Sequence, residues 1–174
     1  VLIAKTIGSD LLSKIRDYCK PKITVRSVGY DPQTGQLDLA ALEAAISEET
    51  AAVCFQNPSY LGFVEVQGHE ISRIAHDLGA ICIVEADPMS LGVLTPPADY
   101  GADIVCGDIQ PLGMHMQFGG GHAGYIATHD DEAYVMEYPS RMFGIAPTSV
   151  PGEYGFGDVA YERTSFAIRE EGKE

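Results

Sequence analysis

Two short polar segments follow apolar runs typical of buried strands, and their side chains could take part in chemistry. The first, 57–62, carries an amide, a hydroxyl and a phenol at Asn57, Ser59 and Tyr60, and Pro58 stiffens it. These groups donate and accept hydrogen bonds, as the lining of a binding pocket must. Taken alone, however, the composition of the segment favours an ordinary turn.

The second polar segment, 85–90, begins with two carboxylates, Glu85 and Asp87, followed by Pro88. A carboxylate at the end of a strand could hold the protonated ring nitrogen of a cofactor. It could equally cap the helix that follows. Both interpretations remain open at this point.

A glycine-rich run spans residues 118–124 and includes Gly119 and Gly120. It lacks the G-x-G-x-x-G fingerprint after a first strand and the Lys-Ser/Thr pair of a P-loop, so we do not expect a nucleotide site there. The glycines instead favour close backbone approach, or a tight turn before the next strand.

Other kinds of catalysis find little support in the sequence. It contains no G-x-S-x-G elbow and no Ser-His-Asp order, and its five histidines lack the spacings of zinc sites. Three of the four cysteines lie in apolar runs, and none forms a C-x-x-C pair. This pattern is typical of buried thiols in a reducing compartment, so we expect no metal, no disulfide framework and a cytoplasmic location.

The elements that must position these residues alternate between apolar strands and amphipathic helices. Strands are predicted at 1–4, 22–28, 51–55, 80–84, 103–106 and 123–128, and helices at 9–19, 38–48, 69–78 and 132–137. We expect Ser9 or Asp10 to cap the first helix and Gly79 to follow the third. The alternation predicts an α/β fold of three layers with a mainly parallel sheet, whose carboxyl edge is the place for a ligand.

Composition and charge narrow the class of protein. The 174 residues carry 11 basic and 25 acidic side chains, a net charge of −14, which disfavours nucleic acids and anionic membranes as partners. No apolar run is long enough to span a membrane. The start lacks Met and a basic stretch, so we expect a piece of a longer protein without a signal peptide.

Several segments together make this sequence resemble the P-protein of the glycine cleavage system, the pyridoxal-phosphate (PLP) dependent glycine decarboxylase. The resemblance is strongest to its α half, subunit 1, and extends from Val1 to about Arg141. It is carried by residues 30–38, 50–53, 56–62, 101–105, 110–113, 118–120 and 124–128. It implies part of the large domain of fold-type I PLP-dependent transferases over 1–138. Residues 139–174 are then a Pro/Gly-rich arm and the start of a truncated C-terminal region.

The resemblance also implies where a catalytic lysine should stand. In the β half of the family a His-Lys pair follows the Gly-Ala-Asp strand, and that lysine forms the Schiff base. Here the corresponding pair is Gln110-Pro111. The lysines stand at 5, 14, 20, 22 and 173, and we expect none near this edge of the sheet. Without a positioned amine no Schiff base forms, so the resemblance implies no catalytic residue and no covalent PLP on this chain.

For the complete enzyme, the resemblance implies that PLP decarboxylates glycine and that the aminomethyl group passes to a lipoyl carrier. Its implied partners are a catalytic β subunit, which holds the PLP, and the lipoyl carrier (H) protein. Candidates for a vestigial pocket or subunit contact are Asn57, Ser59, Tyr60, Asp87, Gln110, Gly119 and Gly120. Ordinary strand-end loops explain each of them at least as well, and for Asp87 we favour a capping role.

Three departures from the family and two alternatives accompany this hypothesis. Gly121 stands where the family usually has proline, Ser140 replaces a glycine, and residues 146–161 match loosely. One alternative is an autonomous PLP enzyme of the class V aminotransferase type, which requires a strand-end lysine. The other is a non-enzymatic scaffold or interaction domain.

Overall fold

The computed structural model describes residues 1–116, 118, 123–135, 137–138 and 143–158. The chain divides into two compact units, Val1–Ala127 and Thr128–Glu174. The sequence places a boundary after residue 138, where the Pro- and Gly-rich composition begins. No helix in the described part is long and apolar enough to cross a membrane.

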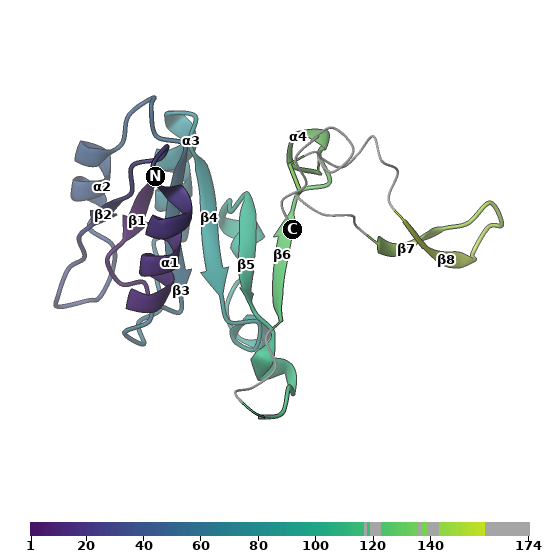
Figure 1. The fold of residues 1–174 in the computed structure, drawn as a ribbon. Helices are drawn as coiled ribbons and strands as arrows, with labels where there is room; N and C mark the ends of the chain where they lie inside the picture. Colours follow the sequence, from purple (N-terminus) through teal and green to yellow (C-terminus); the bar gives the residue numbers. More distant parts are fainter. Residues whose placement is uncertain (117, 119–122, 136, 139–142, 159–174) are drawn as a thin grey trace. The chain divides into compact units, whose positions relative to one another are not determined.

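A six-stranded sheet forms the centre of the first unit, in the order β2-β1-β3-β4-β5-β6 (Figure 1). Its strands are β1 (Leu2–Ala4), β2 (Arg26–Val28), β3 (Ala52–Asn57), β4 (Ile81–Ala86), β5 (Ile104–Asp108) and β6 (Gly124–Thr128). Neighbouring strands from β2 to β5 pair in parallel. The backbone N–H of Ile109 donates to the carbonyl of Ala123 at 3.0 Å, so β6 begins beside the end of β5. The predicted mainly parallel sheet is confirmed.

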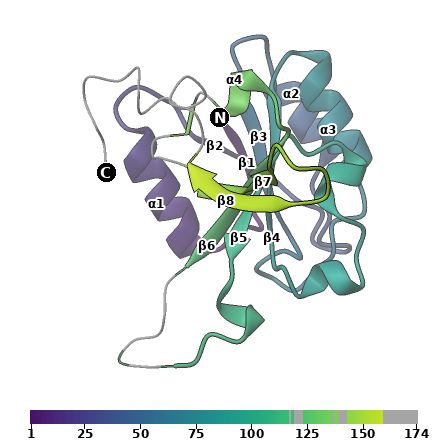
Figure 2. The same cartoon turned by 90° about the vertical axis from the view of Figure 1, so that its right-hand side faces the viewer.

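Helices cover both faces of this sheet. Figure 2 shows α1 (Ser9–Cys19) on one side and α2 (Leu39–Ala45) with α3 (Gly68–Asp77) on the other. Short 3₁₀ turns follow β4 and β5, namely η1 (Ser90–Gly92), η2 (Pro97–Tyr100) and η3 (Gln110–Leu112). The three-layer α/β architecture is therefore confirmed.

The two faces of the sheet differ in how completely they are buried. On the side of α2 and α3, Phe55, Leu42 and Ile71 belong to a large cluster of buried side chains. On the other side, the cluster is small, and no residue of α1 is fully buried. Since apolar burial drives folding, the α2–α3 face contributes most of the core.

The residues that cap the helices agree with the sequence prediction for α3 but not for α1. Asp38 caps α2, because its Oδ1 accepts the N–H of Ala41 at 3.0 Å. The expected cap of α1 at Ser9 or Asp10 is wrong, since Gly8 is the N-cap and no side chain bonds there. Gly79, with φ +74°, follows α3 as expected.

The three central strands run further than predicted. β3, β4 and β5 end at residues 57, 86 and 108, each two residues beyond the expected end. Conversely, the strand expected over 22–28 is paired only from Arg26 to Val28. The extra residues include Gln56 and Glu85, which are polar and therefore look like loop residues in the sequence.

The second unit contains α4 (Glu132–Val135) and an antiparallel hairpin of β7 (Phe143–Pro147) and β8 (Tyr154–Asp158). The sequence predicts an irregular arm here, and for residues 143–158 that is wrong. The prediction failed because these strands are rich in glycine. Gly144, Gly155 and Gly157 alternate with larger residues, and glycine is more typical of a turn than of a strand.

Candidate functional site at the carboxyl edge of the sheet

The carboxyl ends of β3, β4 and β5 meet at one edge, and the loops that follow them hold the predicted site residues. Asn57 ends β3 and is only 7% exposed. Its Nδ2 donates to the carbonyl of Glu65 at 3.2 Å and to Tyr100 Oη at 3.4 Å, and its Oδ1 accepts the N–H of Glu65 at 3.1 Å. The amide of Asn57 thus closes the loop back onto its own strand.

Ser59 acts within the same loop. Its Oγ accepts the N–H of Phe63 at 3.2 Å, and its own N–H donates to the carbonyl of Phe63 at 2.8 Å. Tyr60 differs, because its side chain is 68% exposed. The Tyr60 ring lies against Gly8, and its N–H donates to the carbonyl of Thr6 at 3.1 Å. Of these residues, Tyr60 presents the larger accessible surface.

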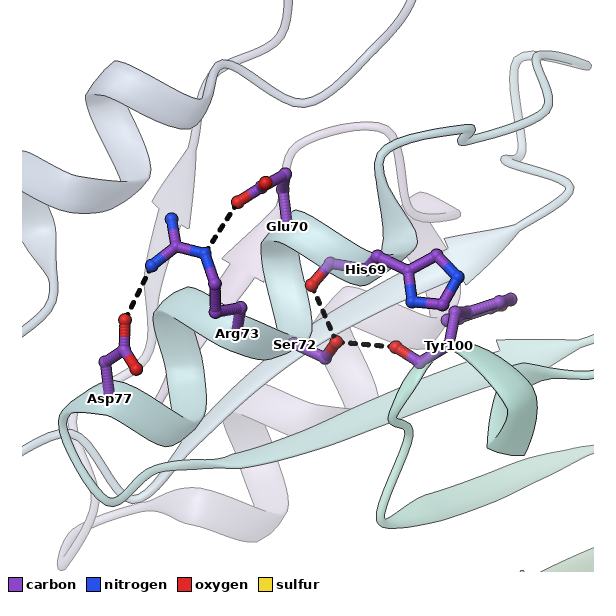
Figure 3. A network of polar contacts seen from close by, with 6 residues as sticks. All are labelled: His69, Glu70, Ser72, Arg73, Asp77 and Tyr100. Atoms are coloured by element: carbon purple, nitrogen blue, oxygen red, sulfur yellow. Dashed lines mark hydrogen bonds and ion pairs between the residues drawn. The ribbon is translucent and has the colours of Figure 1, made fainter.

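Tyr100 joins this loop to α3 (Figure 3). Ser72 Oγ contacts the carbonyls of Tyr100 at 2.5 Å and His69 at 3.0 Å, and the ring of His69 stands edge-on to that of Tyr100. Further along the helix, exposed Arg73 pairs with Glu70 and Asp77. Since Tyr100 Oη also contacts Asn57, the polar groups around Tyr100 bind the helix to the end of β3.

Asp87, directly after β4, forms hydrogen bonds with the two residues at the start of the turn that follows. Its Oδ1 accepts the N–H of Met89 at 2.9 Å, and its carbonyl accepts both the N–H and the Oγ of Ser90 at 3.0 and 2.6 Å. The short helix η1 has Met89 as its N-cap and no side-chain cap, so the capping role that the sequence favours for Asp87 stays a prediction.

Gln110 and Pro111 form the exposed turn η3 after β5. The N–H of Gln110 donates to Asp108 Oδ1 at 2.7 Å, and its Nε2 donates to the carbonyl of Met114 at 3.1 Å. Pro111 offers no amine at the position that the family resemblance assigns to the lysine. The predicted Gly119 and Gly120 lie outside the described residues.

The expectation that no lysine lies near this edge is wrong for Lys5. Lys5 directly follows β1, and its N–H donates to the carbonyl of Val28 at 2.9 Å. Because β1 is parallel to β3, Lys5 stands at the same carboxyl edge. Three strand spacings separate β1 from β5, roughly 14 Å at about 4.8 Å each, so Lys5 belongs to the opposite end of that edge.

Polar residues inside the strands form a row that the sequence did not predict, although it singled out Glu85 as a polar residue at a strand end. Gln56 of β3 is paired in register with Glu85 of β4, and Glu85 with Cys106 of β5. Side chains alternate along a strand, and Cys54 packs in the cluster beneath α1, so this row points to the α1 face. The signal for it was Glu85, a carboxylate inside the apolar run Ile-Val-Glu-Ala.

The protein environment raises the pKa of these groups. Burial raises the pKa of Glu85, a hydrogen bond from Gln56 lowers it in part, and the nearby carboxylates of Asp87 and Asp108 raise it further. Burial also raises the pKa of the Cys106 thiol, and that of Cys54 to about 12. The inner part of this edge is thus acidic and only partly solvated.

The described residues do not fit PLP. A bound PLP requires a lysine for its aldehyde and donors or cations for its anionic phosphate. The strand ends nearest Pro111 instead offer Glu85, Asp87 and Asp108, all acidic. Among the residues that the structure describes, no group of three His, Cys, Asp or Glu side chains could hold a metal ion either.

Comparison with known proteins places this arrangement in a family. The model of the family "Glycine cleavage system P-protein" matches residues 1–155. The chain is 41% identical over 157 residues to "Probable glycine dehydrogenase (decarboxylating) subunit 1" of Carboxydothermus hydrogenoformans, covering 90% of this chain and 34% of that protein. The protein with the same description from Staphylothermus marinus is 38% identical over 150 residues, covering 86% and 32%. The chain therefore spans about a third of the length of the curated relatives that it matches.

Solved structures support the same assignment. A crystal structure of the glycine decarboxylase (P-protein) of the glycine cleavage system, in inhibitor-bound form, has a TM-score of 0.80 and 34% identity, covering 97% of this chain and 36% of that one. Cystathionine gamma-lyase from Lactobacillus plantarum has a TM-score of 0.55 at 23% identity, covering 73% and 32%, and shares the fold alone. The matches in sequence and in structure agree, and this chain belongs to the glycine cleavage system P-protein family.

Proposed function

We propose that this chain is part of subunit 1 of a glycine dehydrogenase (decarboxylating) and contributes structure and contact surface to it. The observation that carries the proposal is Pro111, which stands in the turn η3 after β5 where the resemblance implies the Schiff-base lysine. The descriptions of the relatives as subunit 1 support the existence of a partner subunit. We assign no chemical step of the reaction to a residue of this chain.

We infer that the partner subunit holds PLP, because this chain has Pro111 where the resemblance implies the Schiff-base lysine. In the complete enzyme, glycine is decarboxylated and its aminomethyl group passes to a lipoyl carrier protein, the second partner. The four cysteines carry free thiols, as expected in a reducing compartment, which supports a cytoplasmic location.

The contact with the partner subunit is proposed to lie at the carboxyl edge. Three successive strand-end loops expose large apolar side chains there, among them Tyr60 after β3, Val93 after β4 and Met116 after β5. Val93 and Met116 are each 91% exposed. Clusters of exposed apolar side chains are typical of surfaces that another protein covers.

The test is co-expression of this chain with its cognate catalytic subunit, followed by an assay of exchange between the glycine carboxylate and bicarbonate. We expect exchange from the complex and none from this chain alone. Val93→Asp should weaken co-purification and exchange together. Tyr18→Asp, a matched change on the outer side of α1, where Tyr18 is 92% exposed, should leave both unchanged.

Three outcomes would replace the proposal. Exchange by this chain alone with added PLP, or an adduct stable to borohydride, would establish an autonomous PLP enzyme. Binding to the partner without any effect on exchange would identify a scaffold. Equal loss of binding in the Val93 and Tyr18 variants would place the contact elsewhere.

A further inference from the structure

Two buried oxygens between β3 and β4 have no hydrogen-bond partner. Gln56 and Glu85 are paired in register on these strands. Gln56 Oε1 and Glu85 Oε2 are both fully enclosed, and neither receives a hydrogen bond. Both atoms are acceptors when the carboxyl is ionised, and buried acceptors without a donor destabilise a fold.

A single proton would satisfy both atoms. The two side chains stand beside each other in register, and the interaction with Gln56 lowers the pKa of Glu85 in part. A proton on Glu85 Oε2 would make that atom a donor, and Gln56 Oε1 is an acceptor with nothing bound to it. The neutral acid and the amide would then form a closed pair across the two strands.

The surroundings of Glu85 offer no cation to offset a charge. The groups that face it from the neighbouring elements are Cys106 of β5, Tyr125 of β6 and Leu11 of α1. Asp87 and Asp108 flank it at the strand ends and would repel a second negative charge. Among the described residues that line this space, none carries a positive charge.

We propose that Glu85 is a neutral acid in the folded protein and that its proton bridges β4 to Gln56 of β3, so that the carboxyl edge of the sheet weakens when this proton is lost. The proton bridge is independent of any cofactor. It lies next to Asn57 on β3 and two residues before Asp87. It makes the stability of this edge dependent on pH.

The sign of the dependence follows from linkage. Burial raises the pKa of Glu85 above that of the same residue in the unfolded chain, where the ordinary value is 4.5. Between these two pKa values, the folded protein holds one proton more than the unfolded chain. The unfolding equilibrium constant therefore rises by up to about tenfold per pH unit in this window and levels off above the folded-state pKa. Raising the pH weakens the fold, and lowering it restores the bridge.

The first measurement is a carbon NMR titration of the 174-residue chain with its glutamate carboxyl carbons labelled. We expect one carboxyl to titrate above all others, and its signal to be missing in Glu85→Gln. Glu43→Gln, which changes an exposed glutamate of α2, should leave this signal in place. Gln56→Leu keeps Glu85 but removes its acceptor, and should shift the high-titrating signal.

The second measurement is denaturant unfolding between pH 5 and pH 8. The glutamine of Glu85→Gln donates where the acid would, so this variant should fold and lose the pH dependence described above, while Glu43→Gln retains it. A Glu85 signal that titrates with the exposed glutamates would overturn the proposal. It would mean that Gln56 turns its Nε2 toward an ionised Glu85. If Glu85→Gln fails to fold, the NMR titration of the unaltered chain and of Gln56→Leu still tests whether Glu85 holds its proton.

Discussion

Replacing Asn57 by alanine distinguishes a structural role from a pocket role for this residue. The change removes three hydrogen bonds, two to the backbone of Glu65 and one to Tyr100 Oη. At about 0.5–1.5 kcal/mol net for each bond, the loss is about 1.5–4.5 kcal/mol. Asn57 and Tyr100 are 7% and 6% exposed, so water cannot easily replace the lost partner. We therefore expect the free energy of unfolding to fall by about 2–4 kcal/mol.

Urea unfolding followed by circular dichroism measures this loss. The midpoint should fall while the slope of the transition stays unchanged, and the melting temperature should drop by roughly 4–16 °C. Gln110→Ala is the control, because its exposed side chain makes one bond in a surface turn, and it should stay within about 0.5 kcal/mol. If Asn57→Ala is as stable as the control but abolishes glycine exchange in the complex, our assignment of a structural role is refuted.

Three further predictions follow from the packing, the thiols and the surface. Gly107→Ala should destabilise the chain by about 2 kcal/mol or more, because the added Cβ would collide with the carbonyl oxygen of Ala86. Gly29→Ala is the control and should be tolerated, because no atom lies within 4 Å of a Cβ added there. The midpoints of denaturant unfolding compare the two variants. Burial raises the pKa of Cys54 to about 12, so its thiol stays protonated and should resist iodoacetamide at pH 8. Mass spectrometry should find the cysteine of α1 labelled first, and prior labelling of Cys54 would contradict this order. Arg73→Ala should leave the melting temperature unchanged within error, because the ion pairs of Arg73 with Glu70 and Asp77 are exposed to solvent. A clear drop in the melting temperature would show that these exposed pairs stabilise the fold.

Much of the fold could be predicted because local patterns determine it. The helix over residues 9–19 was predicted with its observed bounds, since Leu11, Leu12 and Ile15 lie on one face. Gly79 could be assigned as the residue after α3 because its left-handed backbone suits glycine. The hairpin of β7 and β8 could not, because cross-strand pairing supplies what its glycine-rich sequence lacks.

The candidate site was harder to predict because its contacts join distant parts of the chain. Asn57 bonds to Tyr100, 43 residues away, a contact that its place in a turn-like segment does not indicate. Lys5 stands at the same carboxyl edge because β1 pairs in parallel with β3, a pairing that no local pattern contains.

By itself, the sequence determined the α/β class, the positions of most strands and helices, and the missing amine at Pro111. These depend on residue type, on periodicity and on the order of motifs, which are properties of the chain before it folds. Only the tertiary structure decided that Glu85 faces Gln56 with both oxygens enclosed, because strand register and burial set that contact. The charge state of a carboxyl depends on what surrounds it, so the sequence could place Glu85 at a strand end but could not show what its proton does.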